Sequence, residues 1–284
     1  MKRALVIGGS GQLGTEIRRS WTQWEISAPS HSDLDIENGD AVDAFVRSRN
    51  PDAVVNCAAF HNVDRCEEEP DRALAVNAIA VERLARACRD SGAAFATLST
   101  DYVFDGTATA PYTESDCARP LSAYGVSKLA GEQLVARLQS GALVVRTCGV
   151  YGVRPSAAKG HTFVDRVIAQ GRAKEAIRVV DDVTASPTFA GHLADALRGL
   201  VEAGATGLYH AANTGPVTWY EFAVEALRQA GVDHRVEPIP AASWKAPAKR
   251  PVYSALDSGK LRSLGIHMPD WREGIAAYLR LLRA

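Results

Sequence analysis

A glycine-rich turn directly follows the first apolar run of the chain and limits the folds open to it. Residues 4–8 read ALVIG and residues 8–14 read GGSGQLG, which contains both GxxGxxG and GxGxxG. Gly8, Gly11 and Gly14 stand where a chain must turn off a strand, approach a pyrophosphate and pack a helix closely on that strand. The free N–H groups at the start of the next helix favour phosphate. The turn, including Ser10 and Gln12 within it, therefore predicts a dinucleotide site.

Short apolar runs then alternate with longer amphipathic segments. Strands are expected at 4–8, 52–59, 93–100 and 142–148, and helices at 11–21, 71–92 and 121–139. Strands that are apolar on both sides, each followed by a helix, indicate a parallel sheet covered on both faces. The fold class predicted is α/β, a doubly wound Rossmann-like sheet. Prolines break the pattern after about residue 150. We expect a dinucleotide-binding domain over 1–150 and a smaller, mainly substrate-binding part over 151–284, with some segments returning to the main sheet.

Composition narrows the class of protein. The chain has 284 residues and a formal net charge of −1, which gives no electrostatic footprint for nucleic acid. No apolar run approaches the ~20 residues that span a bilayer, so no membrane association is expected. Its 5 cysteines are scattered without a CxxC pair, so neither a disulfide framework nor a metal site is predicted. These features are typical of a reduced, cytoplasmic protein.

The loop after the second strand bears on which coenzyme is bound. The strand should end near Ala28, where an acidic residue would hold the ribose hydroxyls of NAD. The chain instead reads PSHS over 29–32, and Ser30 or His31 would hydrogen-bond a 2′-phosphate. This favours NADP(H), with NAD(H) as the alternative. Asp35 and Ile36 follow and are expected to flank the adenine.

A tyrosine and a lysine one helical turn apart supply the candidate chemistry. Tyr124 and Lys128 lie in LSAYGVSKLAGE, after Pro120, and four residues on a helix share a face. A neighbouring ammonium and an oxidised nicotinamide are expected to lower the phenol pKa, so Tyr124 exchanges a proton with a carbonyl or alcohol. Thr100 ends an upstream strand, at the edge where ligands bind in such sheets, and is expected to orient the carbonyl.

Together these motifs resemble the extended short-chain dehydrogenase/reductase family, and within it the reductases of nucleotide-linked 4-keto-6-deoxysugars of the dTDP-4-dehydrorhamnose type. STDYVFDG over 99–106 and PLSAYGVSKLAGE over 120–132 carry most of the likeness, which extends over nearly the whole length. The resemblance implies a dinucleotide lined by the residues of the glycine turn, now with Leu13, by Tyr124 and Lys128, and by Asp35, Ile36, Ala58, Ala59, Phe60, His61 and Leu98. It implies substrate contacts from Thr100, Asp101 and Tyr124, with Gly149 at the sugar and Arg250 a candidate for the diphosphate.

The substrate half departs from the family pattern. Where relatives carry a tryptophan that packs on the sugar, this chain has Gly149; Thr162, Val183 and Ala185 are further departures. Dehydratases of the family have an Asp-Glu pair after the threonine, whereas here Tyr102 follows Asp101, which favours simple ketone reduction. A nucleotide-sugar ketoreductase is therefore expected. A regulatory subunit of a partner enzyme, or an epimerase or reductase of another carbonyl, is the alternative; a homodimer is left open.

Overall fold

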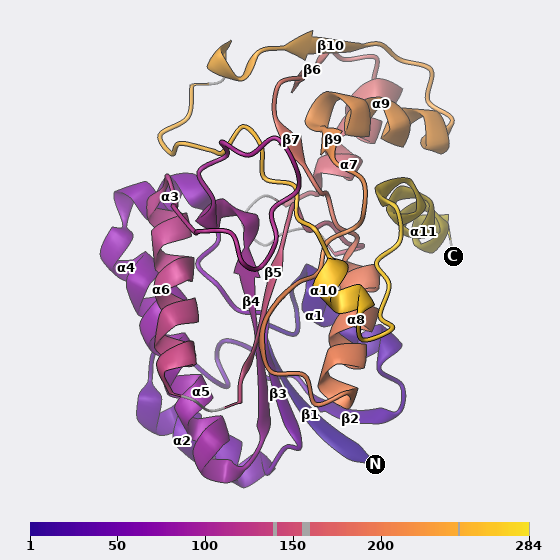
Figure 1. Cartoon of the computed structure of the whole chain (residues 1–284). Helices are drawn as coiled ribbons and strands as arrows, with labels where there is room; N and C mark the ends of the chain where they lie inside the picture. The colour runs from indigo at the N-terminus through magenta and orange to yellow at the C-terminus, as the bar shows by residue number, and fades with distance from the viewer. Residues whose placement is uncertain (139–140, 155–159, 244, 284) are drawn as a thin grey trace.

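A six-stranded parallel sheet forms the centre of the protein, in a computed structural model that describes residues 1–138, 141–154, 160–243 and 245–283 (Figure 1). The strand order is β2-β1-β3-β4-β5-β8, and every neighbouring pair is parallel. The predicted doubly wound fold is confirmed. The strands of the sheet are β1 (Lys2–Ile7), β2 (Trp24–Ser27), β3 (Ala53–Asn56), β4 (Ala94–Thr100), β5 (Leu143–Thr147) and β8 (Gly207–His210).

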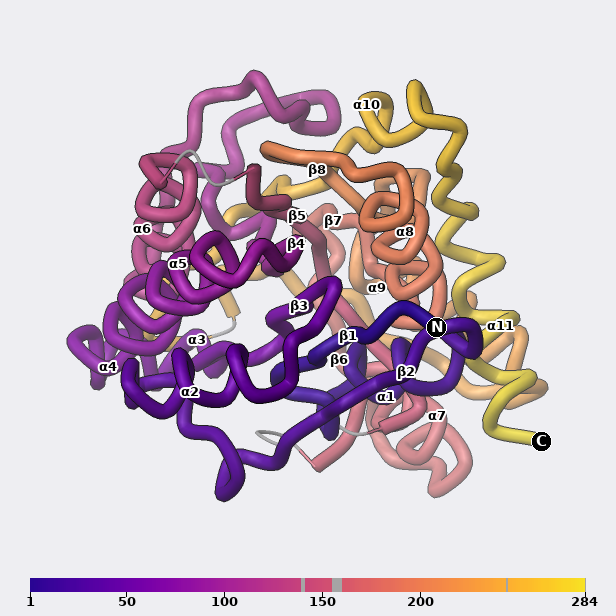
Figure 2. Tube along the Cα trace, turned by 90° about the horizontal axis from the view of Figure 1, so that it is seen from below, coloured from indigo at the N-terminus to yellow at the C-terminus, as the bar shows by residue number. Residues whose placement is uncertain are grey.

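Helices cover both faces of this sheet (Figure 2). One face carries α2 (Gly39–Arg49), α5 (Ala80–Ser91) and α6 (Ala123–Arg137), and the other carries α1 (Gln12–Ser20) and α8 (Ala190–Glu202). Side chains of β1 alternate between the two layers: Leu5 joins the core beneath α2 and α5, whereas Val6 joins the core beneath α1 and α8. This two-sided burial explains why the strand reads as a continuous apolar run.

The helix expected over 71–92 is interrupted. It consists of α4 (Pro70–Leu74), a π-helical turn (Ala75–Ile79) and α5, and it ends at Gly92, whose φ of +75° is left-handed. A β-carbon on Gly131 of α6 would collide with the carbonyl oxygen of Asn77 in the π turn. The helix predicted over 121–139 begins at Ala123 and ends at Arg137; residue 139 lies outside the described residues.

Later segments build a smaller part above the carboxyl ends of the sheet strands, where Figure 1 shows β6, β10, α7 and α9. Strands β6 and β10 pair in parallel, and β7 and β9 pair antiparallel. Strand β8 and helix α8 return to the main sheet. The remaining elements are β6 (Ile177–Val180), β7 (Thr184–Ala185), β9 (Val217–Thr218), β10 (Val236–Ile239), α3 (Val63–Glu68), α7 (Phe163–Arg172), α9 (Trp219–Ala230), α10 (Gly259–Arg262), α11 (Trp271–Arg283) and two short 3₁₀ turns, Asp101–Val103 and Ala241–Ser243.

Within the described ranges, no helix is both long and apolar enough to cross a membrane. The same part of the chain holds no group of three or more His, Cys, Asp or Glu side chains placed to bind a metal ion. The five cysteines, at 57, 66, 88, 117 and 148, are free thiols.

Candidate active site

The glycine turn has the close backbone packing that a dinucleotide requires. Gly8 has φ +75°, and a β-carbon there would lie 2.9 Å from the Ala58 nitrogen. A β-carbon on Gly14 would lie 2.5 Å from the Gly8 oxygen and from the Gly9 Cα. Helix α1 begins behind Gly11, which has no side chain to cap the first N–H groups. The glycines thus leave a space that β-carbons would fill, next to N–H groups that no side chain caps. Such a space fits a pyrophosphate.

The segment that follows β3 is fixed by two buried asparagines. The Asn56 side chain accepts a hydrogen bond from the Ala58 N–H (3.1 Å). Asn77 accepts from the Phe60 N–H (2.8 Å) and donates to the Phe60 oxygen (3.0 Å) and to Ser127 on α6 (2.9 Å). Asn77 thereby ties the loop after β3 to α6, the helix of Tyr124. Phe60 and the adjoining residues predicted to line the dinucleotide lie in this braced loop.

The loop after β2 contains a carboxylate that sequence reasoning did not place there. Asp33 accepts hydrogen bonds from the Ser30 hydroxyl (2.6 Å) and the Ser30 N–H (2.9 Å). These bonds lower the pKa of Asp33, so the group is ionised at neutral pH. The Ser30 hydroxyl offered to a 2′-phosphate is thus engaged by Asp33, while His31 is exposed. Asp35, also exposed, accepts from the Glu37 N–H (3.0 Å), and Ile36 is buried.

The structure brings together Thr100, Tyr124 and Lys128. Thr100 ends β4, and the other two lie one turn apart near the start of α6. The Thr100 side chain lies close enough to the Tyr124 phenol to lower its pKa. The Lys128 ammonium donates to the Leu98 oxygen on β4 (2.7 Å). Ser122 caps α6 by accepting from the Gly125 N–H, which sets where the helix and its phenol begin.

The pKa of Tyr124 departs from the sequence-based expectation. Burial raises the pKa of the phenol, and the nearby Thr100 side chain opposes this only in part. The expected lowering by the neighbouring ammonium is not what the chain alone produces, because desolvation of the phenolate dominates. Burial also lowers the pKa of Lys128 to about 8, with the Glu132 carboxylate acting in the opposite direction.

Asp101 lies beside Thr100 in a fully buried position. Its carboxyl group accepts hydrogen bonds from the Thr100 hydroxyl (3.0 Å) and the Cys148 thiol (3.0 Å). Burial raises the pKa of Asp101. Tyr102, the residue after it, packs edge-on against Tyr124 with ring centres 5.9 Å apart. Tyr124 therefore lies near both a buried carboxyl group and an aromatic ring.

Of the four departures from the family pattern, Gly149, Val183 and Ala185 lie beside Trp219 at the start of α9, and Thr162 precedes a residue that packs on it. Gly149 has φ +50°, and a β-carbon there would lie 3.0 Å from the edge of the Trp219 ring. The Val183 oxygen accepts from the Trp219 N–H (3.2 Å), and Ala185 shares an apolar cluster with the indole. Thr162 caps α7 beside Phe163, whose ring centre is 4.9 Å from that of Trp219.

Arg250 forms an ion pair that the sequence did not indicate. Its guanidinium donates to the Asp64 carboxylate on α3 (2.9 Å) and to the Ala248 oxygen (3.1 Å). The Ala248 N–H in turn donates to Asp64 (3.2 Å). The predicted contact of Arg250 with a diphosphate remains a prediction, and such a contact would compete with this pair.

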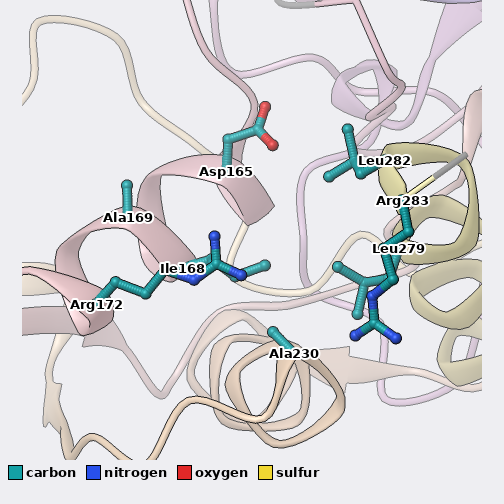
Figure 3. A pocket seen from close by; sticks show the side chains of 8 residues that line it. All are labelled: Asp165, Ile168, Ala169, Arg172, Ala230, Leu279, Leu282 and Arg283. Atoms are coloured by element: carbon teal, nitrogen blue, oxygen red, sulfur yellow. The ribbon is translucent and has the colours of Figure 1, made fainter.

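One cavity lies away from these residues. It occupies about 210 Å³ between α7, α9 and α11 (Figure 3). Its wall includes Asp165, Ile168, Arg172, Leu279 and Arg283, and contains none of the predicted site residues. Asp165 is already bonded to Thr162 and to the Tyr278 hydroxyl. This cavity is therefore distinct from the site at the sheet edge.

Some contacts at the site could not be read from the sequence. Glu132 and Arg146 form a buried ion pair beneath Lys128 (2.6 Å). Nothing in the sequence identified Glu132 as the partner of Arg146. Proximity of Glu132 to Lys128 could have been predicted, because residues four apart on a helix lie on the same face.

A glycine turn beneath a Tyr–Lys helix on a doubly wound sheet places this chain in the extended short-chain dehydrogenase/reductase class, whose members are NAD(P)-dependent oxidoreductases. Within that class it belongs to the RmlD substrate binding domain family, whose model matches residues 1–284.

Relatives agree with this assignment over almost the full chain. The chain is 39% identical over 286 residues to a dTDP-4-dehydrorhamnose reductase of Streptomyces griseus, covering 96% of this chain and 91% of the relative. It is 38% identical to a probable dTDP-4,6-dihydroxy-2-methyloxan-3-one 4-ketoreductase of Streptomyces antibioticus, covering 96% and 93%. A dTDP-4-dehydrorhamnose reductase of Bacillus anthracis in complex with NADP is similar in structure, with a TM-score of 0.93, 35% identity, and 98% and 99% covered.

Proposed function

We propose that this protein reduces the keto group of a dTDP-linked 4-keto-6-deoxysugar, with NADPH as the preferred reductant. The observation that carries the proposal is the meeting of Thr100, Tyr124 and Lys128 at the edge of the sheet. The names of the Streptomyces relatives support this substrate class, and the NADP complex of the Bacillus anthracis relative supports the coenzyme. The ionised Asp33 beside Ser30 is an argument for NAD. A comparison of the Kd values for NADPH and NADH decides between the two coenzymes.

In this reaction the residues of the chain would have the following roles. The glycine turn and the uncapped start of α1 hold the pyrophosphate of the dinucleotide, whose nicotinamide supplies the hydride. Tyr124 delivers a proton to the carbonyl oxygen. Its pKa, raised by burial, keeps the phenol protonated until that step. Thr100, whose side chain lies beside the phenol, would hold the carbonyl oxygen within reach of Tyr124.

Two further candidates are less well supported. A cofactor-binding regulatory subunit would not need Thr100, Tyr124 and Lys128 to meet. Epimerisation or reduction of another carbonyl uses the same trio, and only a substrate panel distinguishes it.

The part of the chain after residue 150 would supply the substrate wall, with Trp219 as its aromatic surface. Gly149 and Ala185 lie at this indole, Val183 bonds to the Trp219 backbone, and Thr162 precedes Phe163, which packs on the ring. The edge of the Trp219 ring occupies the space beside Gly149. An aromatic surface donated by α9 instead of by the segment after β5 approaches the sugar from a different direction. We infer that the sugar accepted here differs in its ring substituents from that of relatives with a tryptophan at this position.

The test is NADPH oxidation, followed at 340 nm, with a panel of dTDP-4-keto-6-deoxysugars. Tyr124→Phe should lower turnover about 10²–10⁴-fold while leaving the Kd for NADPH nearly unchanged. Tyr102→Phe is the matched control, because that ring packs on Tyr124 without joining the trio, and its turnover should stay near wild type. The proposal fails if Tyr124→Phe keeps more than about a tenth of the rate, since general acid catalysis is worth more than that.

A further inference from the structure

A buried ion pair lies one helical turn beyond Lys128. The Glu132 carboxylate accepts two hydrogen bonds from the Arg146 guanidinium on β5, from Nε (2.9 Å) and from Nη2 (2.6 Å). It also accepts a hydrogen bond from the Ser99 hydroxyl on β4. Lys128, Glu132 and Arg146 are only 5%, 7% and 3% exposed, so solvent screens their charges weakly.

The same two residues of β4 hold both charged groups of the helix. The Leu98 oxygen accepts from Lys128 and the next residue, Ser99, donates to Glu132. Ser99 is also paired in register with Arg146 across β4 and β5. A carboxylate thus stands between two buried cations, Lys128 on its own helix and Arg146 on the sheet. Removal of its charge would leave both cations without a buried counter-charge, which is costly.

In the described part of the chain, Glu132 is the carboxylate paired with Arg146, and Lys128 has no ion pair of its own. The nearest titratable group on the sheet does not change this charge balance. His210 on β8 lies with Nε2 3.5 Å from Arg146 Nη1. Burial and the Arg146 charge lower the pKa of His210 to about 4, so this side chain is neutral at physiological pH. Asp101 and Cys66 act on Tyr124. A cavity of about 300 Å³ reaches Glu132 and Arg146 from behind α6, and its other lining residues are uncharged.

We propose that Glu132 is a positioning residue for the proton step: held by Arg146 and Ser99, it keeps the Lys128 ammonium charged and anchored beside Tyr124. The proposal rests on the function proposed above, because it assigns Glu132 a role through Lys128. It predicts that the charge at 132, and not only the packing there, sets the pH at which the enzyme loses activity.

Two variants with opposite charge effects test this inference. Glu132→Gln keeps the shape of the side chain and removes the negative charge, so the ammonium form of Lys128 is disfavoured. The alkaline limb of kcat/KM against pH should then move to lower pH by about one unit or more. Arg146→Met removes the competing cation and leaves Glu132 to act on Lys128, so the limb should move to higher pH. The matched control is Glu82→Gln, which removes the negative charge from another buried carboxylate, one paired with the exposed Arg86 and Arg137, and should not move the limb.

If Glu132 and Arg146 only stabilised the fold, the two variants would not move the alkaline limb in opposite directions. If both buried variants lose activity with the limb in place, the inference is overturned. Where either single variant fails to fold, the double variant Glu132→Gln with Arg146→Met removes both charges together, and its limb should fall below that of the wild type. A limb at the wild-type pH in the double variant would also overturn the inference.

A separate readout distinguishes this inference from the proposed function. The pH dependence of the Kd for NADPH, measured by fluorescence quenching, reports the charge on Lys128 without any sugar present. If the wild type reduces no sugar in the panel, the proposed function fails, and the same shifts are then sought in the binding curve. Unshifted binding curves in the Glu132 and Arg146 variants would refute the role of Glu132 by itself.

Discussion

Substitution of Gly149 by alanine tests whether this residue and Trp219 form one unit. Gly149 has φ +50°, and an L-residue in that conformation costs roughly 1–2 kcal/mol. The new β-carbon would also lie 3.0 Å from the Trp219 ring edge and 3.3 Å from the Pro187 Cα. Overpacking of this kind costs about 1–3 kcal/mol. Gly149→Ala should therefore lower the free energy of unfolding by about 2–5 kcal/mol, the lower and upper sums of the two costs.

A second substitution separates the two contributions. Trp219→Phe shortens the ring and removes the atoms that the new β-carbon would meet. In that background Gly149→Ala should cost only the backbone contribution and the contact with Pro187. The double variant should then be more stable than the sum of the single changes predicts, by about 1 kcal/mol or more, which exceeds the ~0.3–0.5 kcal/mol within which independent sites add.

Urea denaturation followed by circular dichroism measures the four free energies of this cycle. The cycle of Gly149→Ala with Tyr220→Phe is the control, since Tyr220 is adjacent in sequence and does not lie against Gly149. That control cycle should be additive. If the Trp219 cycle is additive as well, the indole does not occupy the space beside Gly149. The proposal that Trp219 of α9 forms the aromatic wall of the substrate site would then be wrong.

Three further outcomes are expected. Gly14→Ala places a β-carbon 2.5 Å from the Gly8 oxygen and the Gly9 Cα, so the turn must open; the Kd for NADPH in a fluorescence titration should rise at least tenfold, about 1.4 kcal/mol. The pKa of His210 is lowered to about 4 in the folded protein, so as the pH falls the unfolded chain takes up a proton on this group before the folded chain does. The free energy of unfolding should therefore fall by up to about 3 kcal/mol because of this group as pH drops from 6.5 to 4. Thermal melts of His210→Gln should lack this part of the pH dependence. In the native protein Cys117 is the exposed thiol among the five cysteines, so an aromatic disulfide reagent should rapidly titrate one thiol per chain.

Each of these expectations has a contrary result. Unchanged NADPH affinity in Gly14→Ala would mean that the dinucleotide does not lie over the turn. Identical pH dependence of the melts with and without His210 would mean that the imidazole charges freely in the folded state. Fast reaction of several thiols would contradict the burial of Cys66, whose pKa burial raises to about 11.

The central sheet could be predicted because its strands are apolar on both faces and local in sequence. β1, β3, β4 and β5 all fall within the ranges expected from apolar runs or extend them by two residues. β8 was not specified, because GLYH over 207–210 is short and lies among segments broken by proline and glycine. The π turn in residues 75–79 also has no composition signal, since it accompanies the close approach of Asn77 to Gly131 on another helix.

Within the site, the elements were predictable and the pairings were not. Thr100 and Tyr124 meet because parallel strands end at one edge and the next helix begins there. Arg250 and Asp64 are joined across 186 positions, a distance at which sequence order says nothing about contact. The raised pKa of Tyr124 in the chain alone was not predicted for a related reason: its neighbour along the helix could be seen in the sequence, and its burial could not.

The place of β8 at the end of the sheet has a consequence for synthesis on the ribosome. The first 150 residues emerge with five parallel strands but with β5, whose residues are all buried in the finished protein, as an unpaired edge. That edge acquires its neighbour only when residue 210 has left the exit tunnel. Until then the nascent chain exposes the unpaired edge of β5, and exposed strand edges promote aggregation. We therefore expect the chain to be most prone to aggregation while residues 150–210 are being translated.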